Sequence, residues 1–201
     1  MSIFLGCSHR GAVRNLLKDA RGFSLTELLA TTVILMLVGM VVATGIPAAQ
    51  RAYEGVMNAS NADVYLSTTT GRLREVLGEA DPEEDVEVAP STNILVSFTS
   101  KKTGRQVSIL NSFDNKAGIY VQEIQYDPVD HTPSHQVGPS LLVPQSVGAG
   151  AGGVQFVAEV NSIGYAQGVF TVSKITVKDA KPDGATYAEL DELAVKPIAA
   201  D

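Results

Sequence analysis

A long uncharged apolar run occupies the N-terminal quarter of this chain of 201 residues. Between Leu28 and Gln50 no Asp, Glu, Lys or Arg occurs over 23 consecutive positions. At about 1.5 Å per residue, a helix of that length extends roughly 34 Å, which is enough to cross the hydrocarbon core of a bilayer. The run therefore predicts a membrane-spanning helix.

The charges on either side of the run predict its orientation. The first 22 residues hold four basic residues and one acidic residue, a formal charge of +3, while the whole chain carries −7, so the remainder carries −10 (−7 − 3). Because basic flanks stay in the cytoplasm, we expect a cytoplasmic N-terminus and an extracytoplasmic segment after Arg51. An acidic remainder is a poor counterion for phosphate, so direct nucleic-acid binding is not expected.

One carboxylate, Glu27, stands directly before the apolar run. Placing a carboxylate in or near hydrocarbon costs roughly 2.5 to 3.5 kcal/mol on the translocon scale, and a plain anchor gains nothing from it. Two explanations are open. Glu27 is either solvated just outside the membrane, where the helix macrodipole favours it, or paired with a cation in an assembly of helices.

The stretch GFSLTELL, from Gly22 to Leu29, resembles the prepilin processing motif of type IV pilins and of the related pseudopilins of type II secretion and competence systems. The resemblance covers about residues 10–55: basic leader, glycine, aromatic residue, glutamate and apolar run follow in that order. It implies that prepilin peptidase, a membrane enzyme, cleaves between Gly22 and Phe23 and that Phe23 becomes N-methylated. Glu27 would then be the fifth residue of the mature chain.

The resemblance also suggests what Glu27 does. In a bundle of identical helices, the α-amino group freed on Phe23 of a neighbouring subunit is a candidate cation for the carboxylate. Such a pair is a weak source of stability but fixes register, because a slip leaves both charges unpaired. A pair within one chain is also possible, since four residues separate Phe23 from Glu27.

Pro47 lies near the end of the apolar run and has no N–H for the carbonyl of Ala43. With Gly39 and Gly45 nearby, we expect a helix kink at Pro47. The alternative is a helix that stops near Gly45 at the membrane exit. Small residues in this region also allow helices to approach closely.

After Pro47 the apolar positions are spaced mostly by three or four, which predicts that the helix continues to about Gly78. The expected apolar stripe packs on a sheet and comprises Tyr53, Val56, Met57, Val64, Leu66, Leu73, Val76 and Leu77. An acidic segment containing Pro82 then ends the helix.

The remainder of the chain has the period of strands. We predict strands at 93–100, 105–110, 117–126, 154–160 and 169–178, the last with an irregularity, and hairpin turns at 101–104 and 181–184. A final segment near 187–195 reads as a strand, although it also contains good helix formers. The expected fold is α+β and pilin-like: a long N-terminal helix, its first half transmembrane, packed on a C-terminal antiparallel sheet.

Two loops contain residue types that occur in binding sites. The loop from Asp127 to His135, with Asp130 and His131, holds metal-ligand types, but its prolines and polarity favour a plain exposed loop. The glycine-rich segment at 147–156 precedes a strand, so we interpret it as a connector and not a phosphate loop. No nucleophile elbow or zinc-binding helix pair occurs, and we expect neither an enzyme nor a cofactor.

These inferences give four segments: a basic leader at 1–22 that is removed, a transmembrane and filament-core helix at 23–50, its amphipathic continuation at 51–80, and an extracytoplasmic β-rich head at 81–201. The predicted function is that of a pilin-like structural subunit, a minor pilin or pseudopilin, in the cytoplasmic membrane and then at the cell surface when assembled. Its expected partners are prepilin peptidase, other pilin subunits, membrane lipid and, indirectly, an assembly platform protein and ATPase. Two other hypotheses stay open: an unprocessed single-pass protein with a β-rich binding head, and a secreted hydrolase whose N-terminus lies near Arg51.

Overall fold

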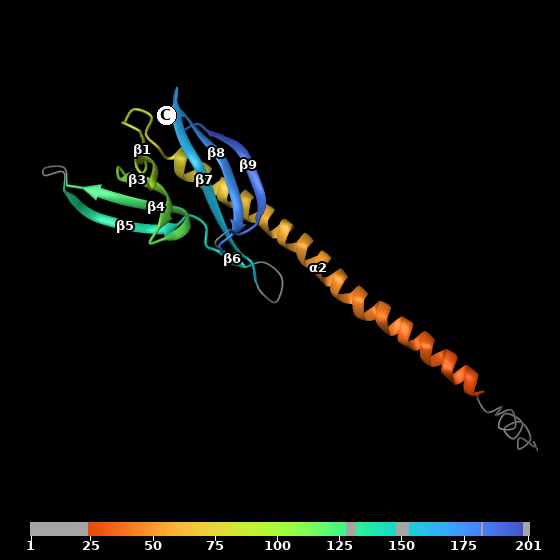
Figure 1. Ribbon diagram of the computed structural model, residues 1–201. Helices are drawn as coiled ribbons and strands as arrows, with labels where there is room; N and C mark the ends of the chain where they lie inside the picture. The colour runs from red at the N-terminus through yellow and green to blue at the C-terminus, as the bar shows by residue number, and fades with distance from the viewer. Residues whose placement is uncertain (1–23, 128–131, 148–152, 182, 199–201) are drawn as a thin grey trace, which may run out of the picture. The chain divides into compact units, whose positions relative to one another are not determined.

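The first described element is α2 (Leu25–Gly78), a helix of 54 residues (Figure 1). It belongs to a computed structural model that describes residues 24–127, 132–147, 153–181 and 183–198. The helix continues through Pro47, so the alternative in which it stops near Gly45 is wrong; the kink itself stays a prediction. It ends at Gly78, just before the acidic segment, as predicted. Along its length it crosses the boundary between two compact units, Met1–Gln50 and Arg51–Asp201.

Nine strands follow α2 in the described part of the chain. They are β1 (Glu87–Ser91), β2 (Ile94–Thr99), β3 (Gln106–Phe113), β4 (Lys116–Tyr126), β5 (Pro133–Leu141), β6 (Ser146–Val147), β7 (Gln155–Ala166), β8 (Val169–Asp179) and β9 (Thr186–Val195). They form two antiparallel sheets, one in the order β1-β2-β3-β4-β5 and one in the order β6-β7-β8-β9 (Figure 1). The predicted α+β architecture, a long N-terminal helix packed on antiparallel β-structure, is confirmed. The strands form two sheets where the sequence predicted one.

The predicted strands and turns correspond to elements of these sheets. The five predicted segments become β2, β3, β4, β7 and β8, and the turn at 101–104 joins β2 to β3, with the Gly104 N–H donating to the carbonyl of Ser100 at 2.7 Å. The final segment is strand β9, so its helical alternative is wrong. The irregularity in β8 is present as a register shift against β9 between Val177 and Lys178. Strands β1, β5 and β6 are elements that the sequence pattern did not predict.

The core lies between the C-terminal half of α2 and both sheets. It is one cluster whose largest fully buried side chains are Phe98, Phe156, Phe170, Leu73, Leu77, Ile109, Ile163 and Ile175. Phe98 of β2 and Phe170 of β8 join the two sheets, with ring centroids 5.7 Å apart. Fully burying one such side chain stabilises the fold by roughly 1.5 to 3 kcal/mol, so this unit is held mainly by apolar packing.

The buried face of α2 differs from the predicted stripe. Tyr53, Val56 and Val64 were expected to pack on a sheet, but their side chains are 65–69% exposed. Leu73 and Leu77 of the predicted stripe are fully buried, as expected. The other buried residues of the helix lie outside that stripe: Asn58, Ala62, Tyr65, Thr69 and Gly78. Thr69 belongs to this face because its hydroxyl donates to the Tyr65 carbonyl at 2.8 Å, so it needs no partner outside the helix. Small residues, and polar residues that form hydrogen bonds within the helix, let α2 approach the sheets closely. A prediction from hydrophobic residues alone does not include them.

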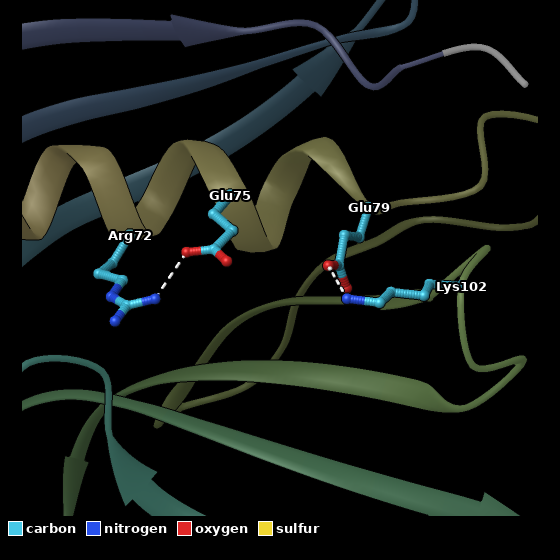
Figure 2. Close-up of polar contacts among 4 residues, drawn as sticks. All are labelled: Arg72, Glu75, Glu79 and Lys102. Carbon is cyan, nitrogen blue, oxygen red and sulfur yellow. Dashed lines mark hydrogen bonds and ion pairs between the residues drawn. The ribbon is translucent and has the colours of Figure 1, made fainter.

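The C-terminal end of α2 is tied to the β2–β3 hairpin. The Asp81 N–H donates to the Thr99 carbonyl at 2.9 Å, and the Lys101 N–H donates to the Glu79 carbonyl at 2.8 Å. Figure 2 shows two ion pairs at this end, Arg72 with Glu75 at 2.8 Å and Lys102 with Glu79 at 3.2 Å. Such solvent-exposed pairs contribute about 0 to 1 kcal/mol, so the backbone bonds and the buried leucines hold the helix end in place.

The two sheets meet where β4 and β7 lie close together. Gly118 of β4 has φ +141°, and a Cβ added there would lie 2.9 Å from Leu141 Cδ2 and 3.3 Å from Val157 Cγ2. The side chain of Asn111 on β3 reaches β7, where its Oδ1 accepts the Val160 N–H at 3.0 Å. The lack of a side chain at Gly118 and the hydrogen bond from Val160 to Asn111 thus allow the two sheets to lie close together.

Candidate membrane and assembly site

The first half of α2 is apolar on all sides, and its side chains are exposed. Every residue at 24–53 is exposed, including Leu25 at 82% and Met36 at 75%. A soluble helix keeps a polar face toward water, whereas a helix that is hydrophobic all round belongs in a core or a membrane. By length and composition α2 is the one helix in the described residues that could cross a membrane, and this is compatible with a single-pass membrane protein.

Polar side chains within this half of the helix form hydrogen bonds to the helix itself. The Thr31 hydroxyl reaches the Glu27 and Leu28 carbonyls at 3.0 and 2.9 Å, and the Thr44 hydroxyl reaches the Met40 carbonyl at 3.0 Å. A polar group without a hydrogen-bond partner costs several kcal/mol in hydrocarbon. This cost is the reason that only helices and closed barrels span membranes. With these internal partners, the threonines tolerate either lipid or a neighbouring helix.

Glu27 lies in the first turn of α2. Ser24 precedes the helix, and its carbonyl accepts the N–H of Glu27 at 2.9 Å and the N–H of Leu28 at 3.1 Å. Ser24 and Glu27 have the S-x-x-E spacing of a capping box, although the Ser24 hydroxyl here bonds the Thr26 hydroxyl at 2.5 Å instead. The carboxylate of Glu27 is exposed, near the positive end of the helix dipole and next to the first apolar residues. It is therefore accessible to a cation from another molecule.

Ser24 is a residue that the motif alone did not single out. Its role in starting the helix could have been read from the spacing of Ser24 and Glu27 ahead of an apolar run. The predicted cleavage and methylation residues, Gly22 and Phe23, lie outside the described residues, so processing at that bond stays a prediction.

The glycines of the apolar run leave room for another helix. An added Cβ at Gly39 or at Gly45 would meet no atom within 4 Å. Small residues in a membrane helix let a second backbone approach closely. Pro47 follows inside the same continuous helix, so the helix can present this surface without a break.

The loop from Asp127 to His135 shows no metal-binding group in its described residues. Asp127 follows β4 and His135 lies on β5, where it is opposite Gln125, whereas Asp130 and His131 lie outside the described residues. The described residues contain no group of three or more His, Cys, Asp or Glu side chains that could hold a metal ion. Strand β7 follows the glycine-rich segment, as predicted for a connector.

Comparison of the chain with protein-family models, with curated proteins and with solved structures gives no match. The observed features are the α+β architecture and an exposed apolar helix with a single carboxylate in its first turn. Chemically, that arrangement can insert into lipid, pack against other helices and bind one cation at Glu27.

Proposed function

We propose that this chain is a structural subunit of the type IV pilin class, a minor pilin or pseudopilin. In this proposal it is inserted through its apolar helix, cut after Gly22 by prepilin peptidase, and packed with other pilin subunits into a pilus or pseudopilus. The chain is the peptidase's substrate and is not itself an enzyme. Its head is extracytoplasmic in the membrane and at the cell surface once assembled.

The observation that carries the proposal is the exposed first half of α2 with Glu27 at its start. A lipid anchor accounts for the apolar surface but not for the carboxylate beside it, which costs free energy in or near hydrocarbon. A filament accounts for both, because helices packed away from water bury the apolar surface and can supply a cation to the carboxylate. The glycines with no atom near them provide surfaces for that packing.

The cation that we assign to Glu27 is the α-amino group freed on Phe23 of a neighbouring subunit. Breaking a buried pair by removing one partner costs about 3 to 5 kcal/mol, so a subunit added out of register would be disfavoured. The pair then works as a register device, and most of the stability of the filament comes from helix packing.

Removal of the leader also has a physical reason. Residues 1–22 carry +3, and they would have to follow the helix through hydrocarbon if the subunit left the bilayer for a filament. Each Lys or Arg at the bilayer centre costs roughly 2.5 to 3.5 kcal/mol on the translocon scale. Cleavage removes this cost before the assembly platform protein and its ATPase extract the subunit.

Co-expression with a prepilin peptidase tests the proposal. The parent chain should shift to a smaller size on a gel, while the Gly22→Ala variant should stay at the uncut size. Gly39→Ala is the matched control, because its glycine lies in the same run with no atom within 4 Å and its cleavage should be normal. If the parent stays uncut beside an active peptidase, the unprocessed single-pass alternative replaces the proposal.

A further inference from the structure

A polar groove follows the seam between the two sheets, within the unit Arg51–Asp201. It consists of neighbouring cavities of about 450, 400 and 250 Å³ that share Glu159 in their walls. The largest cavity lies between the β3–β4 turn and the end of β8, and volumes of this size are typical of small-molecule sites. No residue of α2 lines these cavities.

The groove presents amides and balanced charges. In the largest cavity three amide side chains, Asn115, Gln145 and Gln155, are exposed to a ligand. The charged residues in its described wall are three lysines and three carboxylates, a net charge of zero: Lys116, Lys178, Lys181, Glu159, Asp179 and Asp183. A wall with no net charge does not favour an anionic ligand or a cationic one, whereas its donors and acceptors suit a ligand rich in hydroxyl groups.

The walls of the groove are held in place by short contacts. Lys178 Nζ lies 2.6 Å from a carboxylate oxygen of Glu159, which fixes a donor and an acceptor side by side on β8 and β7. Asn111 lines the two smaller cavities and also bonds the Val160 N–H, so it joins both sheets under the groove. Groups fixed before binding lose less entropy when a ligand arrives.

One end of the groove is aromatic. A further cavity of about 330 Å³ shares Lys116 and Gln145 with the largest one and is lined by Phe113 and Tyr120, whose ring centroids are 5.9 Å apart. Phe113 is 45% exposed, so an apolar surface is available beside the polar one. A ligand that fits both is flat and apolar on one face and carries hydroxyl groups around its edge.

We propose that this groove binds a neutral oligosaccharide. A sugar ring would lie against Phe113, and the hydroxyl groups of the adjoining rings would bond Gln145, Gln155 and the Lys178–Glu159 pair. Sugar rings meet both requirements of the site, since they combine an apolar face with several uncharged donors and acceptors.

The test uses the full unprocessed chain in lipid nanodiscs, because detergents with sugar head groups would compete for the groove. Isothermal titration calorimetry with cellotetraose, with chitotetraose and with the anionic tetragalacturonate measures binding. We expect a saturable signal for at least one neutral tetrasaccharide and a weaker one for tetragalacturonate. Gln145→Ala and Gln155→Ala should each weaken the neutral interaction about tenfold, as expected when a ligand loses a hydrogen-bonding partner.

Gln125→Ala is the matched control, because Gln125 is an exposed glutamine on β4 that does not line the groove. Its affinity should equal that of the parent, and equal unfolding midpoints would show that all variants fold. Tighter binding of tetragalacturonate, or no binding of either neutral tetrasaccharide, would overturn the proposal. So would parental affinity in both Gln145→Ala and Gln155→Ala, or displacement of the sugar by an uncharged peptide at a lower concentration. The chain is uncut and unassembled here, so the result does not depend on its function as a pilin-like subunit.

Discussion

The Tyr65 hydroxyl on α2 donates a hydrogen bond of 3.2 Å to the carbonyl oxygen of Val143, 78 residues later in the chain. Tyr65 is buried, and its ring lies 6.4 Å from that of Phe156 on β7. One side chain thereby connects the helix, the segment between β5 and β6, and the four-stranded sheet. Burial raises the pKa of the Tyr65 hydroxyl above its ordinary value of 10.0.

Tyr65 should make the fold sensitive to alkaline pH. Its pKa is raised in the folded chain. Its contribution to the free energy of unfolding is therefore fully present below the pKa of the unfolded chain, about 10, and is lost as the pH rises through the pKa of the folded chain. Tyr65→Phe should lose about 0.5 to 1.5 kcal/mol at pH 7 with its hydrogen bond, but should lose less further stability than the parent between pH 9 and 11. Thermal unfolding at several pH values measures both effects. Tyr53→Phe is the control at a tyrosine that is 65% exposed, and an equal alkaline loss in Tyr65→Phe and the parent would contradict the prediction.

The corrected helix face predicts which apolar residues matter. Leu73→Ala should lower the free energy of unfolding by about 2 to 5 kcal/mol, because Leu73 is fully buried and its removal leaves a cavity. Val64→Ala, on the same helix but 65% exposed, should change it by no more than about 0.5 kcal/mol. Urea unfolding of both variants decides the matter. Similar losses of unfolding free energy in the two variants would mean that Val64 also packs on a sheet, as the sequence predicted.

Gly118 should be intolerant of any side chain. Gly118→Ala should destabilise the fold by about 1 to 3 kcal/mol, since the added Cβ would lie 2.9 Å from Leu141 Cδ2 and the positive φ is unfavourable for alanine. Gly71→Ala is the contrasting substitution in α2, where no atom lies within 4 Å. It should stabilise the fold by about 0.4 to 1 kcal/mol. A stable Gly118→Ala protein would mean that Leu141 of β5 and Val157 of β7 do not crowd this position.

The sequence predicted the elements whose signals are local. The end of α2 followed from Pro82 and the acidic residues, and β8 followed from its length and β-branched residues, because these signals are local. The prediction failed for β5, whose residues are nearly all exposed and whose Pro133 and Pro139 are typical of an edge strand. The pairing of β5 with β4 is a tertiary fact that no local pattern contains.

The candidate sites divide in the same way. Glu27 could be located because its charge stands out against an apolar run, and its position in the first turn agrees with a cap that begins at Ser24. The groove could not be predicted, because Asn115, Gln145 and Gln155 come from three separate segments that only the packing of two sheets brings together. The sequence does contain one local signal, the pair Asp114–Asn115, because Asp and Asn are common in two-residue hairpin turns. In the structure these two residues have φ of 52° and 59°, as such a turn requires.

Glu27 should be needed for assembly but not for processing. Glu27→Gln keeps the shape of the side chain and removes its charge, which leaves the neighbour's amino group unpaired. Breaking such a pair costs about 3 to 5 kcal/mol, so the yield of sheared fibres should fall at least about tenfold while cleavage continues. Thr26→Ala is the control in the same helical turn and should assemble normally. Undiminished fibres from Glu27→Gln would show that the carboxylate is merely solvated at the helix start.

The mass and N-terminal sequence of the chain recovered from membranes that contain prepilin peptidase test the central claim most directly. The pilin-like account predicts a chain that begins at Phe23, with N-methylation where the host modifies pilins, and that keeps the whole apolar helix. A chain that still begins at Met1 would support the single-pass alternative, and one that begins near Arg51 in the medium would support a secreted protein. Either of those two results would contradict the account.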